Sequence, residues 1–391
     1  MFGLYFHWSF CSSKCIYCDF GSGVLDKKDK EKFADLQKNY IKCCEKQLEY
    51  FAEKIKDKNQ EITSIYFGGG TPSLLDATTI QKLLDKVRNN YNISNDCEIT
   101  LEANPTTFEI KKFEDFAKAG VNRLSLGVQS MNDKNLTWLG RKHNINEALT
   151  AIDKIKNIFP KWSFDLIYGL PEQSIDEWLG ELKQALTLKP QHLSLYTLIV
   201  DENTILGKMV QNGITIPKTD DKMADFYDAT NEFIKNNSNL IHYEVSNYAV
   251  RGYESRHNMT YWKNFDYLGI GAGAHGRLSY ADGKRYEIQN IFNPFEWQES
   301  INACKTGLEV ERLLTKKEQV EEILLMGLRI KEGIDLTDIK SRFDIDLLPF
   351  LNMKKIETFE KNGLLILRNN QLKLTYEGVK ILDFILREII Q

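Results

Sequence analysis

Short apolar runs alternate with longer amphipathic segments over the first half of the chain. The runs are rich in β-branched and aromatic residues, as strands are, and lie at 4–7, 65–68, 99–104, 123–130, 163–169 and 192–198. In the longer segments apolar positions recur about every 3.6 residues, which predicts helices at 28–58, 107–119, 144–158 and 174–187. Strands that alternate with helices predict an α/β fold with a parallel sheet. Because a complete TIM barrel needs about eight such units, six predict an open, partial (β/α)6 barrel of TIM type.

The pattern changes in the second half. Residues 200–280 are less regular and contain one predicted helix near 219–236. From about residue 313, short helices lead to a strand pair with Asn369-Asn370 as its turn, and a final helix follows. Helices with a β-hairpin predict a small C-terminal α+β domain of the winged-helix type. We therefore expect a barrel core at 1–200, a barrel extension at 201–312 and the winged-helix-like domain at 313–391.

Composition limits the classes of partner. The chain has 391 residues, 42% of them apolar, and a net charge of -4, so no basic field attracts nucleic acid or anionic lipid. The winged-helix-like region carries 13 basic and 13 acidic residues, which argues for packing or partner docking and against DNA binding. The N-terminal segment lacks a basic leader, and no apolar run reaches the ~18 residues of a membrane span. We expect a cytoplasmic protein without a membrane span.

Three cysteines follow the first predicted strand. Cys11, Cys15 and Cys18 stand in a CxxxCxxC spacing, and three thiolates on one loop can hold three corners of a 4Fe-4S cluster. The fourth iron is then open to the amino and carboxylate groups of S-adenosylmethionine, a cofactor that supplies radical chemistry. The alternative is a closed zinc site with His7 as fourth ligand. No second cysteine or histidine pair follows, which favours the cluster. The spacing, with Tyr17 before the third cysteine, resembles the radical SAM superfamily.

Polar residues and glycines lie at or just beyond the ends of the predicted strands. They are Gly68 to Thr71, Glu102, Gln129 and Asp165, and the carboxyl ends of parallel strands form the usual ligand site of such sheets. Asp165 lies in an apolar strand and is costly to bury unless it binds something. The alternative for Glu102 is a solvated carboxylate on a loop. Arg141 either binds the carboxylate of a ligand or is a charge on a helix surface.

Two histidines could bind haem iron. His257 lies in HNMTYW, where aromatic neighbours could pack on a porphyrin while the imidazole ligates the metal. A hydrogen-bonded structural histidine is the alternative. His275, after a glycine-rich run, has the same two interpretations.

A family resemblance connects these motifs. The segments CSSKCIYCDF, FGGGTPSLL, LEANP, NRLSLGVQS, LGRKH, FDLIYGLPEQS, YEVSNYA, HNMTYW and YLGIGAGAHG together resemble the HemW-type haem chaperones, relatives of oxygen-independent coproporphyrinogen III oxidase. The likeness covers nearly the whole chain. It implies that Cys11, Cys15 and Cys18 hold the cluster. It also implies that adenosylmethionine is surrounded by Tyr5, Tyr17, Gly69, Gly70, Thr71, Glu102, Gln129, Arg141, Asp165 and, as an apolar wall, Ile199.

Two functions remain open under this resemblance. One is a haem chaperone that binds haem and delivers it to haem proteins; the other is the radical oxidase, which decarboxylates coproporphyrinogen propionates. The oxidase has a longer segment before its cluster and a further cysteine two residues after the third, where this chain has Phe20. HNMTYW is similar to the haem-binding HNxxYW of the chaperones. Some relatives have a cysteine just before the His-Asn pair, but this chain has Ser255, which leaves His257 as the favoured ligand.

The resemblance favours the chaperone, with haem as a further bound group. Whether the chain is also an enzyme stays open, and we assign no catalytic residue. As partners we expect haem-accepting apoproteins of unknown identity, including peripheral contact with membrane haem proteins. The chain itself is expected to be a monomer or a haem-dependent dimer.

Overall fold

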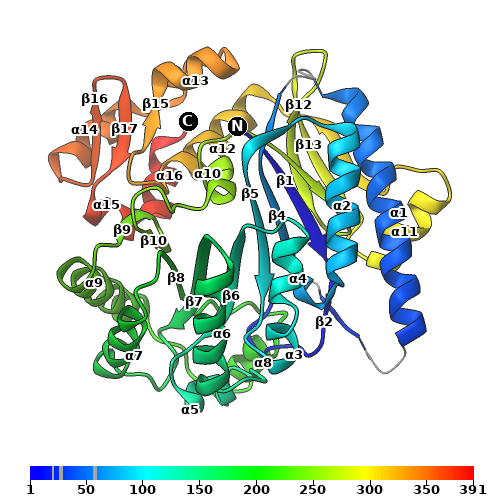
Figure 1. Ribbon diagram of the computed structural model, residues 1–391. Coiled ribbons are helices and arrows are strands. Elements are labelled where there is room, and N and C mark those ends of the chain that lie inside the picture. Colours follow the sequence, from blue (N-terminus) through cyan, green and yellow to red (C-terminus); the bar gives the residue numbers. More distant parts are fainter. Residues whose placement is uncertain (20–21, 26–29, 56–59) are drawn as a thin grey trace.

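Six parallel strands form the centre of the molecule (Figure 1). The computed structural model describes residues 1–19, 22–25, 30–55 and 60–391. The strands are β1 (Phe2–Trp8), β4 (Ile62–Gly69), β5 (Ile93–Ala103), β6 (Arg123–Gln129), β7 (Lys161–Tyr168) and β8 (His192–Thr197), paired in that order. Each pair in this series is parallel. The partial (β/α)6 barrel predicted from the sequence is therefore confirmed.

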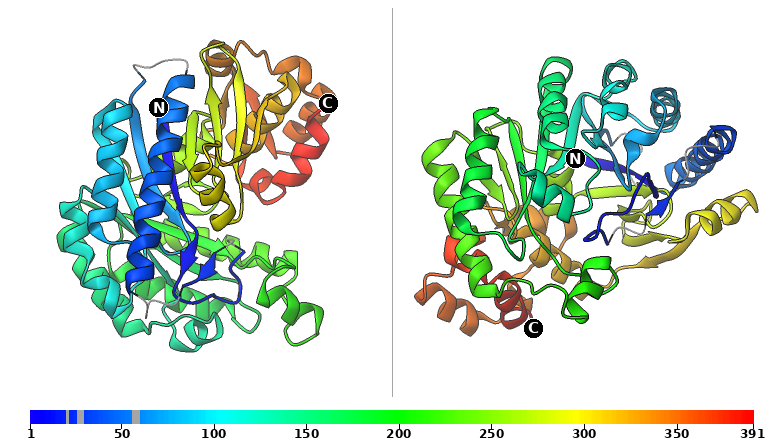
Figure 2. Two further views of the ribbon diagram at one scale, coloured as in Figure 1. Left: turned by 90° about the vertical axis from the view of Figure 1, so that its right-hand side faces the viewer. Right: turned by 90° about the horizontal axis from the view of Figure 1, so that it is seen from below.

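Helices cover the outer face of these strands (Figure 2). They are α1 (Lys30–Lys54), α2 (Ala77–Asn90), α3 (Thr107–Ile110), α4 (Phe113–Lys118), α5 (Asp133–Trp138), α6 (Ile145–Ile158) and α7 (Ile175–Thr187). Part of the segment expected as the first helix, 28–58, lies outside the described residues. The helix expected at 107–119 is instead the two short helices α3 and α4. Between them Lys112 donates to the main-chain oxygens of Ser73 and Leu74, both at 3.0 Å, which ties this point to the loop after β4.

The alternation of residue types along each strand separates two environments. On β5, Ile99 and Leu101 belong to the apolar core under the helices. Glu98, Thr100 and Glu102 occupy the alternate positions, and successive side chains of a strand point to opposite faces. The neighbouring strands continue this arrangement, because Ser163 donates to Ser125 (3.0 Å) inside the sheet. The inside of the barrel is therefore polar, which suits a charged ligand.

The sheet extends well beyond the six predicted strands. On one side β11 (Asp266–Ile270) pairs in parallel with β1, and the antiparallel strands β12 (His275–Ser279), β13 (Arg285–Asn290) and β14 (Leu308–Leu313) follow. On the other side β10 (Asn247–Ala249) and β9 (Ile241–Glu244) continue from β8. The expectation that 200–280 is irregular is thus wrong for these segments. The expected boundary at residue 200 stays a prediction, because the sheet crosses it without a break.

Short elements connect the extension. They are α8 (Ile205–Gln211), α9 (Asp220–Asn237), α10 (Arg256–Trp262), which carries His257, and α11 (Pro294–Asn302). α9 agrees with the helix expected near 219–236. No helix in the described ranges has the length and apolar character that crossing a bilayer requires.

The C-terminal region has a hydrophobic cluster of its own. It contains α12 (Lys316–Gly327), β15 (Ile334–Asp335), α13 (Leu336–Phe343), α14 (Met353–Lys361), β16 (Leu365–Arg368), β17 (Gln371–Leu374), α15 (Tyr376–Lys380) and α16 (Leu382–Ile389). Asn369 and Asn370 join β16 to β17 with φ of 53° and 59°, the left-handed conformation of a tight hairpin turn, as predicted. This region contacts the barrel through Lys380, which pairs with Asp228 of α9 at 2.8 Å.

Candidate functional site

The cysteine loop is fastened to the carboxyl ends of the central strands. It begins in β2 (Phe10–Cys11), which pairs with β3 (Gly23–Val24), so both ends of the loop lie together. Gly70, just after β4, donates its N–H to the main-chain oxygen of Trp8 at 2.7 Å. Ile16 accepts from the N–H of Leu206 at 2.8 Å. The loop is therefore held at the end of the barrel where parallel sheets bind ligands. Phe20 lies outside the described residues.

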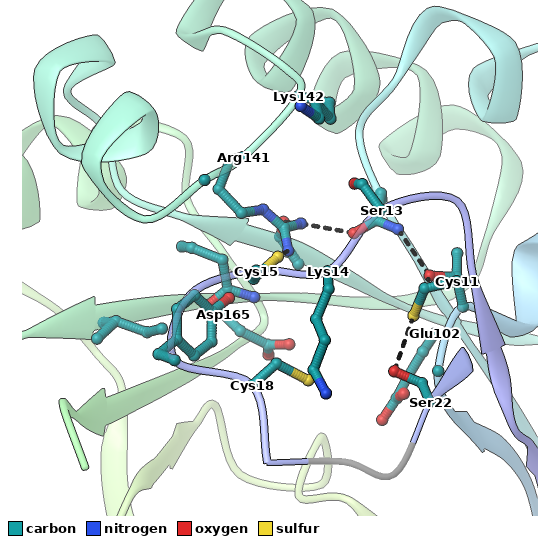
Figure 3. Close-up of a pocket in the computed structure, with 18 of the residues that line it drawn as sticks. Cys11, Ser13, Lys14, Cys15, Cys18, Ser22, Glu102, Arg141, Lys142 and Asp165 are labelled. Carbon is teal, nitrogen blue, oxygen red and sulfur yellow. Dashed lines mark hydrogen bonds between the residues drawn. The ribbon is translucent and has the colours of Figure 1, made fainter. Parts of the chain in front are cut away.

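A cavity of about 450 Å³ opens beside this loop (Figure 3). Twelve of the predicted site residues line it. They are Cys11, Cys15, Tyr17, Cys18, Gly69, Gly70, Thr71, Glu102, Gln129, Arg141, Asp165 and Ile199. They come from the cysteine loop, from five consecutive strands or the residues just after them, and, for Arg141, from the segment that follows α5, so the topology brings together residues that are far apart in the sequence. Whether each contacts a cofactor stays a prediction.

A chain of hydrogen bonds runs across one wall of the cavity (Figure 3). Arg141 Nη2 donates to Asn104 Oδ1 at 2.5 Å, and Asn104 Nδ2 donates to Thr71 Oγ1 at 3.4 Å. Thr71 Oγ1 donates to Cys11 Sγ at 3.3 Å, and Cys11 Sγ lies 3.4 Å from Ser22 Oγ. Asn104 was not expected at the site, although it lies in the LEANP motif. The available signal was its position just beyond β5, two residues after Glu102.

Arg141 has one guanidinium nitrogen without a hydrogen-bond partner among the described residues. Nη1 donates to Cys15 Sγ at 3.4 Å, and Nη2 also donates to the main-chain oxygen of Gly127 at 2.7 Å. Nε is buried and has no hydrogen-bond partner in the described structure. A buried donor without a partner is costly, which is the situation expected where a ligand completes the site. Both Nη atoms have protein partners, and Nε is the guanidinium nitrogen that has none in the described part of the chain. Because Nε is also shielded from solvent, a ligand carboxylate can reach it only when the side chain turns.

Two carboxyl groups lie deeper in the cavity. Glu102 accepts a hydrogen bond from Tyr66 Oη at 2.8 Å, and Asp165 accepts one from Ser125 Oγ at 3.3 Å. Burial raises the pKa of Glu102 to about 7 and the pKa of Asp165 to about 6. The Tyr66 hydrogen bond opposes this effect on Glu102, while the charge of Asp165 adds to it. The site is therefore poised to bind a cation, because a positive ligand stabilises the ionised form of both groups.

Backbone geometry at the cavity rim is unusual at two positions. Gly69 has φ of 102°, in the range that favours glycine. Gln129, at the end of β6, has φ of 74° without being glycine. A strained conformation of this kind persists only when its surroundings fix it, and it is frequent at ligand sites.

Tyr5 and His257 are two predicted residues that do not line the cavity, and Gly68 and His275 are two more. Tyr5 lies below it, with Oη 3.1 Å from His7 Nδ1. His257 is 1% exposed, and its two ring nitrogens lie 3.0 Å from Ser64 Oγ and 2.6 Å from Tyr261 Oη. This arrangement matches the alternative of a hydrogen-bonded structural histidine. As placed here His257 cannot ligate iron, because both nitrogens are engaged.

The donor set suits an iron-sulfur cluster better than a closed zinc site. Three thiols share the cavity with the unpartnered Nε of Arg141 and two carboxyl groups. His7, the expected fourth ligand of zinc, does not line the cavity. Among the described residues no three histidine, cysteine or acidic side chains stand in a metal-binding arrangement.

Two protein-family models match the chain. The radical SAM superfamily model matches residues 5–185, which include the cysteine loop and most of the barrel. The HemN C-terminal domain model matches residues 314–381, within the winged-helix-like region.

Several characterised proteins are similar over most of their length. "Heme chaperone HemW" of Escherichia coli is 36% identical over 338 residues, which cover 83% of this chain and 86% of that protein. "Radical S-adenosyl methionine domain-containing protein 1, mitochondrial" of Dictyostelium discoideum is 36% identical over 427 residues, covering 99% and 94%. Among solved structures, the coproporphyrinogen III oxidase HemN of Escherichia coli superposes with a TM-score of 0.81 over 99% of this chain and 89% of its own. At 20% identity this last likeness shows a common fold.

Proposed function

The chain belongs to the HemW-type family of radical SAM proteins, and we propose that it binds haem and delivers it to haem-requiring proteins. The observation that carries this proposal is the 36% identity, over 83% of the chain, to a protein named as a haem chaperone. The family is defined by a 4Fe-4S cluster and S-adenosylmethionine. Together these cofactors supply one-electron radical chemistry when bound. The lining of the cavity is compatible with both.

Side chains of the cavity have distinct proposed roles toward the cofactors. Cys11, Cys15 and Cys18 are the proposed thiolate ligands of the cluster. Arg141, through Nε, is proposed to bind the methionine carboxylate. Glu102 is proposed to accept hydrogen bonds from the ribose hydroxyls or the ammonium group. The remaining proposed contacts to adenosylmethionine are Tyr17, Gly69, Gly70, Thr71, Gln129, Asp165 and Ile199, with Tyr5 behind them.

Adenosylmethionine affinity is expected to depend on pH. The cofactor carries a sulfonium and an ammonium group, which bind more strongly once Glu102 and Asp165 are ionised. Because the pKa of Glu102 is raised to about 7 and that of Asp165 to about 6, affinity should rise with pH through this range. We expect about a tenfold gain between about pH 6 and pH 8. Equilibrium dialysis measures it, and Glu102→Gln should flatten the upper part of the profile.

The same pKa shifts affect the apoprotein in the opposite direction. A carboxyl group whose pKa is raised on folding binds its proton more tightly in the native state. Its contribution to the free energy of unfolding is full below its ordinary pKa and is lost as pH rises through the raised value. The unfolding free energy of the apoprotein should therefore fall as pH rises toward about 7. A flat profile for both binding and stability would contradict the assigned burial of Glu102.

Gly70 is expected to tolerate no side chain. A Cβ at this position would lie 2.6 Å from the main-chain oxygen of Phe10, and backbone atoms cannot move aside without displacing β2. We expect Gly70→Ala to weaken adenosylmethionine binding by at least about tenfold, since 1.4 kcal/mol of strain suffices for that factor. Gly180→Ala is the matched control, because a Cβ there meets nothing within 4 Å. Equal adenosylmethionine binding by the two variants would show that the cysteine loop accommodates a Cβ at position 70 without disturbing the site.

The haem ligand remains a proposal with two candidates. His257 is suggested by the likeness of HNMTYW to HNxxYW, but ligation requires one ring nitrogen to give up Ser64 or Tyr261. His275 on β12 is exposed and needs no such change. Haem titration of wild type, His257→Ala and His275→Ala, followed by the Soret band, distinguishes them. An unchanged band in His257→Ala would remove that residue, and the absence of any band in wild type would contradict haem carriage.

Activity assays separate the proposed chaperone from the oxidase. The reconstituted protein is incubated without oxygen with coproporphyrinogen III, adenosylmethionine and a reductant. We expect no turnover to protoporphyrinogen, together with transfer of haem from the loaded protein to an apoprotein acceptor. Steady formation of protoporphyrinogen would overturn the proposal.

The partners and the location of the protein follow from this function as proposals. Haem-accepting apoproteins are the proposed partners, with peripheral contact where the acceptor lies in a membrane. The oligomeric state is proposed to be a monomer or a haem-dependent dimer. The cytoplasm remains the proposed compartment, although several relatives are named as mitochondrial.

A further inference from the structure

His257 lies directly beneath the cofactor cavity. It sits in α10, which packs against β1 and β4 from the inside of the barrel. An added Cβ on Gly3 of β1 would lie 3.4 Å from His257 Cε1. Burial lowers the pKa of His257 to about 3, so the ring is neutral. With both nitrogens engaged and the ring enclosed, His257 has a fixed position relative to β4.

The His257 ring supports a tyrosine whose hydroxyl bonds a side chain of the cavity lining. The rings of His257 and Tyr66 stack with their centres 5.0 Å apart and an angle of 24° between their planes. Tyr66 Oη donates to Glu102 Oε1 at 2.8 Å, and Glu102 lines the cavity. Three successive contacts therefore lead from Ser64 and Tyr261, through His257 and Tyr66, to a carboxyl group of the site.

Tyr66 has little freedom to move on its own. Tyr5 lies beside both rings, with its ring centre 6.1 Å from that of Tyr66 and 6.1 Å from that of His257. A Cβ added to Gly68 would lie 2.9 Å from ring atoms of both tyrosines, so no space separates them at this point. Gly68, Tyr5 and His257 therefore all border the Tyr66 ring, and His257 is the one of the three that comes from α10. A shift of α10 is then transmitted to the Tyr66 hydroxyl.

We infer that His257 is a positioning residue of the adenosylmethionine site, which acts through Tyr66 on Glu102 and so couples α10 to the cofactor cavity. The inference rests on the cofactor site and not on haem carriage, so a protein that failed to bind haem would still show the coupling. A histidine that only fills the core would stabilise the fold without this directed effect. The two roles predict different effects of His257→Ala on cofactor affinity once Tyr66 has lost its hydroxyl.

A double-mutant cycle tests the coupling in the cluster-reconstituted full chain without haem. Tyr66→Phe keeps the stacked ring and removes only the hydroxyl, so we expect adenosylmethionine affinity to fall about fivefold to tenfold. His257→Ala should cause a loss of about fivefold in the wild-type background and almost none in the Tyr66→Phe background. His242→Ala is the matched control. His242 is also stacked on a tyrosine, Tyr248, but the Tyr248 hydroxyl donates to Asn231, which does not line the cavity.

A second measurement separates positioning from a general loss of stability. The Tyr66 hydrogen bond lowers the pKa of Glu102, so losing it should move the pH dependence of cofactor binding upward. His257→Ala should show the same upward shift as Tyr66→Phe, and His242→Ala should show none. If His257→Ala does not fold, Ser64→Ala replaces it in the cycle, because it removes one hydrogen bond of the ring. The inference would be overturned if His257→Ala lost the same adenosylmethionine affinity in both Tyr66 backgrounds, or if it changed neither the affinity nor its pH profile.

Discussion

Replacing Cys15 by alanine is expected to abolish cluster assembly while leaving the fold intact. The three thiolates of the loop are the proposed protein ligands, and two cannot hold a cube that already has one open corner. Anaerobic reconstitution should give less than about a tenth of the wild-type iron, on the order expected when a ligand of a metal site is lost outright. It should also give no paramagnetic signal on adding dithionite. Iron analysis and spectroscopy of the reduced protein measure both.

Cys304→Ala provides the control for this result. Cys304 is exposed, lies outside the cavity and follows α11, so its loss removes a thiol without touching the site. Its variant should reconstitute like wild type. Full iron content in Cys15→Ala would exclude Cys15 from the ligand set. Reconstituted wild-type protein that contained zinc and no iron would show that the three cysteines belong to the alternative zinc site and not to a cluster.

Local sequence patterns predicted the central sheet because its pairings follow chain order. β4 to β8 each pair with the preceding strand of the series, so alternation and strand order suffice. The pairing of β1 with β11 is different, because it places Phe2 opposite Asp266. No local periodicity encodes a contact of that separation. The four strands β11 to β14 could therefore not be assigned to the sheet from the sequence alone.

The same reasoning explains which site residues were placed well. Glu102, at the end of β5, reaches the cavity because the topology brings the strand ends together, whereas Asp165 lines it from inside β7. Tyr5 lies opposite Tyr66 in the register of β1 and β4, three positions before Gly69, which lines the cavity. How far a residue lies below the cavity depends on the register of its strand, and the motifs carry no information about register. The depth of His257 depends on how α10 packs under β4, another contact between distant parts of the chain.

Asn104 illustrates what a motif conceals. LEANP drew attention to Glu102 because a carboxylate has obvious chemistry, whereas the amide two residues later has a role only through its neighbours. In the structure it connects Arg141 to Thr71 and hence to Cys11. Such a bridging role follows from geometry and has no signature in residue type.

Arg141→Met is expected to weaken adenosylmethionine binding by about 100-fold, which corresponds to about 3 kcal/mol. Methionine keeps much of the length of the side chain but removes the charge and every donor. The proposed contact of Arg141 with the carboxylate of the cofactor is then lost, and Asn104 and the main-chain oxygen of Gly127 lose their donors. Each lost partner adds to the effect, because the remaining polar group stays away from water. Binding to the cluster-reconstituted protein by equilibrium dialysis measures the loss.

Lys142→Met is the matched control for Arg141→Met, because Lys142 is the next residue and also borders the cavity but is exposed. Losing a screened charge at the rim should cost no more than about fivefold. If the two variants lose affinity equally, the effect comes from the general field of the site and not from Nε. If Arg141→Met instead loses cluster content along with cofactor affinity, its contact with Cys15 is the more important one. The comparison therefore assigns Arg141 either to the cofactor or to the cysteine loop, which it contacts through Cys15.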